Sequence, residues 1–212
     1  MAPKRIPHSD FEVISGDKKT KDYLKMQKIM GRFYFNDFFS KFDKIKPDGR
    51  FLEVGPGPGF QTVLVNQRYS PTEIIGLEYS KDMINVAENY SLQKGTSDKI
   101  KFVFGPVEDS ELIKSLGKFD IVYSTFSLHH WKDPLTGIKN LYDALKNNGT
   151  LFIYDFVRGG LLYYLCLRKG IWESIRASYC KDEIANFLKE LNINDSSIRQ
   201  KGLYLDFILK KN

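Results

Sequence analysis

Short, continuously apolar runs recur along this chain, and each is followed by a segment whose apolar residues have helical spacing. Runs of this kind, apolar throughout rather than alternating, are typical of strands covered on both faces. The predicted strands lie at 51–55, 73–79, 100–105, 119–125 and 150–156. The predicted helices lie at 61–69, 80–95, 108–117 and 134–149, the last closed by Gly149. Strands that alternate with helices predict an α/β fold with a parallel sheet between two helical layers.

The two ends of the chain depart from this alternation. Residues 22–42 have apolar positions at helical spacing, with a predicted break near Gly31. Residues 181–191 also predict a helix, and 197–211 predict two strands broken at Gly202. Such a hairpin fits the edge of a parallel sheet.

An aromatic-rich insertion occupies residues 157–180, between the last parallel strand and the final helix. Its position predicts a small helical cap over the sheet. We therefore expect an N-terminal helical or lid segment over 1–32 and one α/β domain over 33–212. The chain has 212 residues, which suits one domain with a small addition.

The sequence "FLEVGPGPGF" places Gly55, Gly57 and Gly59 directly after the first predicted strand. In open α/β sheets, ligands bind beyond the carboxyl ends of the strands. Glycine lets a ligand approach bare backbone, and the following helix offers unpaired N–H groups. A plain turn needs only one glycine, so three at alternate positions predict a ligand site.

Two carboxylates indicate what this ligand is. Glu53 lies two residues before the first glycine, where a negative charge suits a cationic group, such as an α-amino group or a sulfonium, better than a pyrophosphate. Glu78 ends the second strand, 19 residues after Gly59, and a carboxylate there can accept from both ribose hydroxyls. The loop has neither the lysine of a phosphate-binding P-loop nor the last glycine of a dinucleotide motif.

Composition narrows the class of protein further. The chain is 42% hydrophobic and 27% charged, as in ordinary globular proteins, and its net charge of +6 is spread over scattered lysines rather than a basic block. Nucleic acid is therefore not an expected partner. Two cysteines without CxxC spacing, a polar N-terminus and no long apolar stretch predict a cytoplasmic protein with no membrane span.

Four segments resemble the class I S-adenosylmethionine-dependent methyltransferases. They are "LEVGPGPG", "GLEYSKDMINVAEN", "FDIVYSTFSLHHWKDP" and "LYDALKNNGTLFIYDF". The resemblance covers roughly residues 33–210 and points to the small-molecule branch that includes the ubiquinone and menaquinone methyltransferases. It implies a Rossmann-like, doubly wound, seven-stranded sheet that is mostly parallel, with an antiparallel final strand and helices on both faces.

The resemblance also implies S-adenosylmethionine as the cofactor and a role for each matching position. Glu53 and the backbone of the three loop glycines would face its methionine part, and Glu78 would bind its ribose. Tyr79 and Met83 would pack on the adenine. Tyr34, in the N-terminal helix, would close over the methionine end.

Other positions of the resemblance follow the third and fourth strands. The family usually carries an adenine-binding acid where this chain has Pro106, so the backbone N–H of Val107 and the carboxylate of Glu108, or of Asp109, are the expected replacements. Ser124 would offer its carbonyl to the amino group of the cofactor. His130 is expected to be structural or a contact on the cofactor side.

The expected reaction is an in-line displacement on a sulfonium methyl group, in which the enzyme aligns the two partners and excludes water. An oxygen or nitrogen nucleophile needs a general base, for which His129 and Asp155 are the candidates. No metal is expected, since adjacent histidines on one turn point in different directions.

The aromatic residues of the cap indicate a small acceptor that is apolar or aromatic. The sequence "STFS" after the fourth strand differs from the Asp/Asn-Pro-Pro-Tyr/Phe motif of nucleic-acid amino-methyltransferases. Two alternatives stay open: a non-catalytic S-adenosylmethionine-binding subunit of a partner enzyme, and a nicotinamide-dependent oxidoreductase, which the glycine spacing and Glu53 disfavour. The oligomeric state is not predicted.

Overall fold

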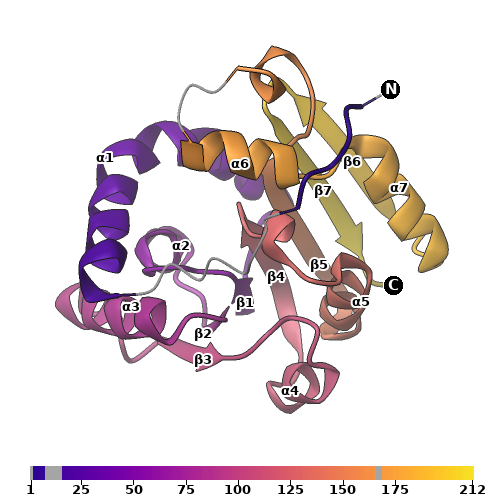
Figure 1. The fold of residues 1–212 in the computed structure, drawn as a ribbon. Coiled ribbons are helices and arrows are strands. Elements are labelled where there is room, and N and C mark those ends of the chain that lie inside the picture. Colours follow the sequence, from indigo (N-terminus) through magenta and orange to yellow (C-terminus); the bar gives the residue numbers. More distant parts are fainter. Residues whose placement is uncertain (1, 8–15, 166–168) are drawn as a thin grey trace.

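A single sheet of seven strands, in the order β3-β2-β1-β4-β5-β7-β6, runs through the molecule. The computed structural model describes residues 2–7, 16–165 and 169–212 (Figure 1). The strands are β1 (Arg50–Val54), β2 (Glu73–Glu78), β3 (Ile100–Phe104), β4 (Phe119–Thr125), β5 (Leu145–Phe156), β6 (Ser196–Lys201) and β7 (Tyr204–Lys210). Strand β7 is antiparallel to both β5 and β6, and the other pairs are parallel. The predicted fold class, including the C-terminal hairpin, is confirmed.

Helices cover both faces of this sheet (Figure 1). They are α1 (Asp17–Phe42), α2 (Phe60–Tyr69), α3 (Lys81–Gln93), α4 (Ser110–Ser115), α5 (Pro134–Asp143), α6 (Lys169–Ala177) and α7 (Lys181–Glu190). Helix α3 begins where its cap was predicted, because the Ser80 hydroxyl accepts the Met83 N–H at 3.2 Å. Asp109 and Asp133 cap α4 and α5 in the same way.

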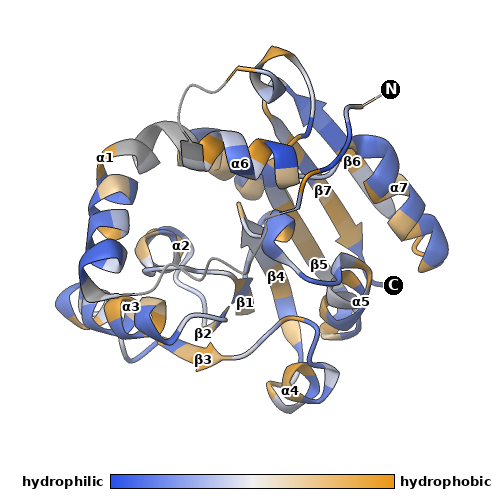
Figure 2. Ribbon diagram, in the orientation of Figure 1, coloured by the Kyte–Doolittle hydropathy of each residue, from blue (hydrophilic) through white to orange (hydrophobic). Residues whose placement is uncertain are grey.

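The two faces of the sheet carry different cores. On one face, aliphatic side chains of the strands pack against α4, α5 and α7; Leu52, Val122 and Ile153 are fully buried there. On the other, aromatic rings dominate, and Phe38 and Phe42 of α1 are fully buried. Figure 2 shows the hydrophobic colour mainly on the inner strands, such as β5, whereas the edge strand β6 is mostly hydrophilic and the helices alternate between hydrophobic and hydrophilic residues. Each helix therefore buries one stripe and leaves the other in water.

Helix α1 is continuous from Asp17 to Phe42, so the predicted break near Gly31 is wrong. The glycine has a packing role instead. A Cβ at this position would lie 2.7 Å from the Phe60 ring and 2.9 Å from the Phe35 ring, closer than real contacts allow. Gly31 thus brings α1 close to the start of α2, and the helix pays only the modest propensity cost of a glycine.

The predicted end of the fifth helix at Gly149 is also wrong. Helix α5 ends at Asp143, and strand β5 begins at Leu145. Strand β5 pairs with β4 through an irregularity between Phe119 and Ile121. A Cβ on Gly149 would lie 2.8 Å from the Lys146 carbonyl oxygen, so this glycine lets the backbone fold closely on itself within the strand.

The cap segment and the first residues of the chain lie together beyond the carboxyl end of the sheet (Figure 1). The short helix η3 (Leu161–Tyr163) and α6 belong to this cap. The Ile6 N–H donates to the Arg176 carbonyl at 3.0 Å, and the Tyr163 hydroxyl donates to the Lys4 carbonyl at 2.7 Å. No helix in the described ranges is long and apolar enough to cross a membrane.

Candidate cofactor site

The glycine loop leaves β1 at the carboxyl edge of the sheet, and all three of its glycines have positive φ: 71° at Gly55, 55° at Gly57 and 76° at Gly59. At two of these positions, close neighbours also leave no room for a side chain. A Cβ on Gly55 would lie 2.2 Å from Ser127 Oγ, and one on Gly59 would lie 2.9 Å from Ala87 Cβ. A Cβ on Gly57 would meet only the Tyr23 ring within 4 Å, at 3.8 Å, so crowding does not require glycine at this position. This is the geometry expected of a loop that a ligand touches.

Glu78 lies directly behind this loop at the end of β2. Its two carboxylate oxygens accept the backbone N–H of Gly57 and of Ser80, each at 2.9 Å. Burial raises the pKa of Glu78, and these two backbone bonds oppose that rise. Glu78 therefore joins the glycine loop to the start of α3 in addition to the ligand-binding role predicted for it.

Glu53 is almost completely buried on the aromatic face, where its carboxylate accepts the Tyr123 hydroxyl at 2.8 Å. Burial raises the pKa of Glu53 to about 7, and the nearby charge of Glu78 adds to this rise. Burial thus disfavours the charged forms of both carboxylates, and a nearby positive charge on a ligand would stabilise them.

A small pocket lies between the glycine loop and the first half of α1. Its lining residues come from α1, the loop, α2 and the end of β4: Tyr23, Gln27, Phe35, Gly55, Pro56, Gly57, Gln61, Thr125 and Phe126. Glu53 is not among these lining residues; its carboxylate is buried beside Tyr123, its neighbour on β4. Sequence reasoning missed the two glutamines and Phe126, since each is an ordinary helix or loop residue and only packing brings them to the loop.

The residues predicted to hold adenine lie at the ends of β2 and β3. Tyr79 is about half exposed and stacks on Phe104 with ring centroids 5.9 Å apart. Met83 is buried in α3. The Val107 carbonyl accepts the Asn140 side chain at 3.0 Å, and Val107 belongs to the aliphatic core. Tyr79 is thus the residue of this group that a ligand can reach most easily.

Glu108 and Ser124 make contacts within the protein. The Glu108 carboxylate accepts the backbone N–H of Lys132 at 2.8 Å and of Asp133 at 3.1 Å. The Ser124 hydroxyl donates to the Val54 carbonyl at 2.9 Å and fixes β4 against β1 beside the glycine loop. Tyr34 belongs to α1, and its side chain lies outside the described part of the structure.

The structure brings the two candidate catalytic residues together. His129 Nδ1 lies 2.7 Å from Asp155 Oδ1, and the His129 backbone N–H donates to Asp155 Oδ2 at 3.0 Å. Both side chains are almost completely buried, and the ring of the exposed His130 lies 4.1 Å from that of His129. Arg5 reaches the His129 carbonyl at 3.5 Å. Across the described ranges, no group of three or more His, Cys, Asp or Glu side chains could hold a metal.

The central part of the chain, residues 52–153, matches the model of a family described as a methyltransferase domain. These residues are a methyltransferase domain. The match includes the glycine loop, Glu78 and the His129–Asp133 turn, and ends inside β5. Together with the fold, it confirms the predicted resemblance to class I S-adenosylmethionine-dependent methyltransferases.

The names of two curated relatives of this methyltransferase domain state different substrates. The malonyl-[acyl-carrier protein] O-methyltransferase of Priestia megaterium is 28% identical over 66% of this chain and 48% of its own length. The ubiquinone/menaquinone biosynthesis C-methyltransferase UbiE of Geotalea daltonii is 27% identical over 53% of this chain and 48% of its own length. The chain thus spans about half the length of these curated relatives.

Solved structures with the same fold cover almost the whole chain, beyond the matched methyltransferase domain. A proposed S-adenosyl-L-methionine-dependent methyltransferase of Methanococcus maripaludis has a TM-score of 0.76 and 19% identity over 99% of this chain and 97% of its own. The plantazolicin methyltransferase BpumL, solved with a triazolic desmethylPZN analog and SAH, has a TM-score of 0.72 and 14% identity over 92% and 91%. At these identities the likeness shows the fold.

Proposed function

We propose that the chain is an S-adenosylmethionine-dependent methyltransferase that acts on a small-molecule acceptor. One observation carries the proposal: a loop of three glycines with positive φ borders a pocket at the carboxyl edge of the sheet through Gly55 and Gly57, and the Glu78 carboxylate accepts the Gly57 N–H. The chemistry of the site fits the cofactor. A positive sulfonium near the two buried carboxylates would stabilise their charged forms, and Gly57, which has no side chain, lets a ligand approach its backbone.

The proposed contacts follow the positions of the side chains. Glu78 accepts the ribose hydroxyls at the edge it shares with the loop, and the exposed Tyr79 covers the adenine. The sheet end at Ser124 and the turn at Val107 and Glu108 form the wall beside the adenine. Glu53 acts from below the pocket, through its charge rather than by contact. The structure of BpumL contains SAH (S-adenosylhomocysteine), which supports a cofactor of this type in this fold.

When bound, the cofactor supplies an electrophilic methyl group on a positive sulfur. The residues of the chain align the acceptor with that methyl group and exclude water. For an acceptor that loses a proton, we propose that His129 takes it and that Asp155, bonded to Nδ1, stabilises the resulting imidazolium. Because both groups are buried, this role needs the acceptor to enter beneath the cap.

Aromatic rings at the carboxyl edge support an apolar or aromatic acceptor. Phe126 lines the pocket and lies 4.7 Å from the Phe156 ring and 5.9 Å from the Tyr204 ring, between centroids. Tyr154 lies 5.4 Å from Phe126 on the same face. A flat acceptor could stack on such a surface next to the cofactor methyl group. Some relatives are named for quinone substrates, which are consistent with this class of acceptor. We also propose that the protein is located in the cytoplasm.

The lid and the cap are also proposals. We propose that residues 1–32 and 157–180 close over the acceptor, because the cap and the segment 2–7 are bonded together beyond the carboxyl edge. Hydrogen exchange in the presence of SAH and an acceptor tests this. Unchanged exchange in both segments would exclude a lid.

Isothermal titration calorimetry tests the proposed cofactor directly. We expect S-adenosylmethionine and SAH to bind with micromolar affinity and NAD to give no heat. Binding of NAD alone would support the oxidoreductase alternative and overturn the proposal. Incubation with methyl-labelled S-adenosylmethionine and a metabolite extract then tests turnover, and binding without any labelled product would favour the non-catalytic subunit.

A further inference from the structure

Gln61 presents an unused donor to the pocket beside the glycine loop. It lies in the first turn of α2 and is only 3% exposed. Its amide oxygen accepts the Thr125 hydroxyl, which orients the side chain. Its amide nitrogen is buried and has no hydrogen-bond partner among the residues that the structure describes. A buried donor without a partner is costly, so native proteins rarely keep one that no ligand uses.

Gln27 presents the opposite group to the same pocket. It lies on α1, and its amide oxygen is buried without a partner within the described ranges. The neighbouring Tyr23 covers Gly57 from the same helix. One pocket therefore contains an unpartnered donor from α2 and an unpartnered acceptor from α1.

A ligand that satisfies both groups must have an acceptor and a donor close together. We propose that Gln61 donates to the α-carboxylate of the cofactor and that Gln27 accepts from its α-ammonium group. This inference rests on the proposed function and adds two residues that read the amino-acid end of the molecule. Glu53 is unsuited to direct contact with the ammonium, because it is buried, accepts the Tyr123 hydroxyl and lies outside the lining of the pocket.

With this pairing, the bound cofactor would also hold α1 against the α/β core, an effect that we call the latch. Gln27 belongs to α1, whereas Gln61 and the glycine loop belong to the α/β core, so one amino-acid group joins the two. Two contacts join this end of α1 to α3: the Gly16 N–H, just before the helix, donates to Asp82 at 2.7 Å, and Lys28 Nζ lies 4.4 Å from the Tyr90 ring centroid. Binding of the amino-acid end should therefore order α1, whereas an adenosine ligand without it should not.

Calorimetry with three ligands tests the assignment. SAH carries the whole amino-acid end, decarboxylated S-adenosylmethionine keeps only the amine, and 5′-methylthioadenosine has neither group. The variants are Gln61→Glu, which keeps the oxygen that Thr125 uses, and Gln27→Leu. The matched control is Gln67→Leu, because Gln67 is exposed on the same helix as Gln61.

We expect Gln61→Glu to weaken SAH binding about 10- to 100-fold and to leave 5′-methylthioadenosine binding unchanged. Gln27→Leu should weaken both SAH and decarboxylated S-adenosylmethionine about tenfold. Gln67→Leu should change nothing. Equal loss for all three ligands in Gln61→Glu would mean a general distortion of the site, and unchanged SAH affinity in both variants would also overturn the inference.

The failure of this inference can be distinguished from the failure of the proposed function. If the wild-type protein binds none of the three ligands, the proposed function fails. If it binds all three equally, the function stands and the inference fails. Hydrogen exchange over residues 20–29 gives an independent reading: SAH should slow exchange there, and 5′-methylthioadenosine at equal saturation should not. Equal protection by both ligands would overturn the latch.

Discussion

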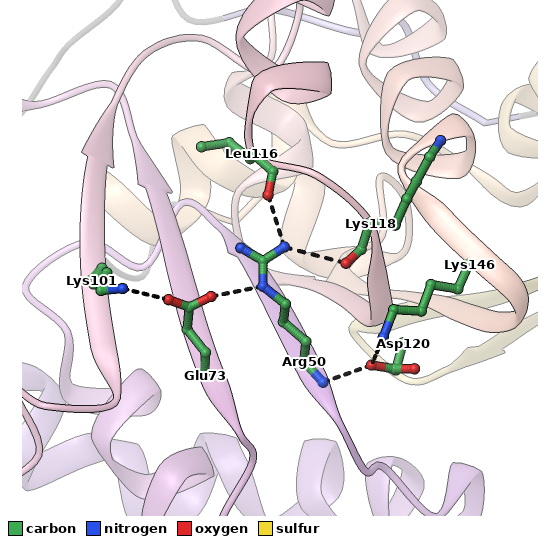
Figure 3. Close-up of polar contacts among 7 residues, drawn as sticks. All are labelled: Arg50, Glu73, Lys101, Leu116, Lys118, Asp120 and Lys146. Atoms are coloured by element: carbon green, nitrogen blue, oxygen red, sulfur yellow. Dashed lines mark hydrogen bonds and ion pairs between the residues drawn. The ribbon is translucent and has the colours of Figure 1, made fainter.

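The two ends of strand β2 place the same side chain in opposite settings. Glu73 begins the strand and accepts Arg50 Nε and Lys101 Nζ, each at 2.7 Å (Figure 3). Glu78 ends the strand, and its carboxylate accepts the backbone N–H groups of Gly57 and Ser80. Lys101 and Arg50 lower the pKa of Glu73, whereas burial raises that of Glu78. One carboxylate is paired with cationic side chains of the protein, and the other is held by backbone N–H groups behind the glycine loop.

The amino end of the sheet is closed by such contacts. Besides Glu73, the Arg50 guanidinium donates to the Leu116 carbonyl at 2.8 Å and the Lys118 carbonyl at 3.2 Å (Figure 3). The Asp120 carboxylate accepts the Arg50 backbone N–H and binds Lys146, both at 2.8 Å. These donors and acceptors satisfy one another, so this end contributes stability and offers no site. At the carboxyl end, by contrast, the unpartnered amide groups of Gln27 and Gln61 favour a ligand site.

The largest expected effect is a pH dependence at the carboxyl end. Because the pKa of Glu53 is about 7 in the fold and 4.5 ordinarily, the folded protein binds more protons between these values. Stability therefore falls as pH rises from about 4.5 to about 7, by about 3 kcal/mol. Glu53→Gln should remove this loss. In urea denaturation, the free energy of unfolding of the wild type minus that of the variant should therefore fall by about 3 kcal/mol between pH 5 and pH 8.

Glu73→Gln should leave the difference between pH 5 and pH 8 unchanged and should alter it, in the opposite direction, only below about pH 4.5. Its lowered pKa means that its contribution is present above pH 4.5 and is lost as pH falls further. If the Glu53→Gln difference is the same at both pH values, the buried carboxylate is not the source of the pH dependence.

The next effect concerns ligand affinity. Glu78→Ala should weaken SAH binding about 10- to 100-fold, because it removes charge-assisted bonds to the ribose and releases the Gly57 N–H. Glu78→Gln should be intermediate, since it keeps an acceptor and loses the charge. Glu73→Ala, on the same strand, should leave the affinity unchanged. Calorimetry on variants checked for folding by circular dichroism measures this, and equal affinity for Glu78→Ala and the wild type would place the ribose elsewhere.

A smaller effect separates two glycines with positive φ. A Cβ on Gly57 would be 3.8 Å from its nearest neighbour, so Gly57→Ala should cost only about 1–2 kcal/mol of stability and weaken SAH binding at least about tenfold. A Cβ on Gly49, where φ is 88°, would be 2.4 Å from the Asp120 carboxylate. Gly49→Ala should therefore lower stability more and leave affinity unchanged. A reversed pattern in thermal melts and titrations would contradict the comparison.

The smallest effect is expected from Arg50→Gln. Its side chain is 27% exposed and that of Glu73 is 22% exposed, so solvent screens the pair. We expect a loss of about 1 kcal/mol in the free energy of unfolding at low salt, a smaller loss in 0.5 M salt, and no change in SAH affinity. A salt-independent loss would mean that stacking of the Arg50 guanidinium on the Phe119 ring, with Cζ 4.4 Å from the centroid, is the main contribution.

The sequence by itself determined the fold and predicted where the candidate site lies. Continuous apolar runs separated by helical patterns encode a parallel sheet, because strand burial and helix amphipathicity are read over a few residues. The three loop glycines and Glu78 were equally visible, since a motif at the end of a strand has its partners nearby in sequence. The cap at Ser80 was predicted for the same reason.

Only the tertiary structure decided which distant residues meet. Gly31 looked like a break and proved to be a close contact with Phe60, because its neighbours come from another helix. His129 and Asp155, 26 residues apart, became a hydrogen-bonded pair. Gln27 and Gln61 became two walls of one pocket. Spacing along the chain does not encode such meetings, because they depend on how helices pack across a sheet face, and that packing is settled by the shapes of many side chains together.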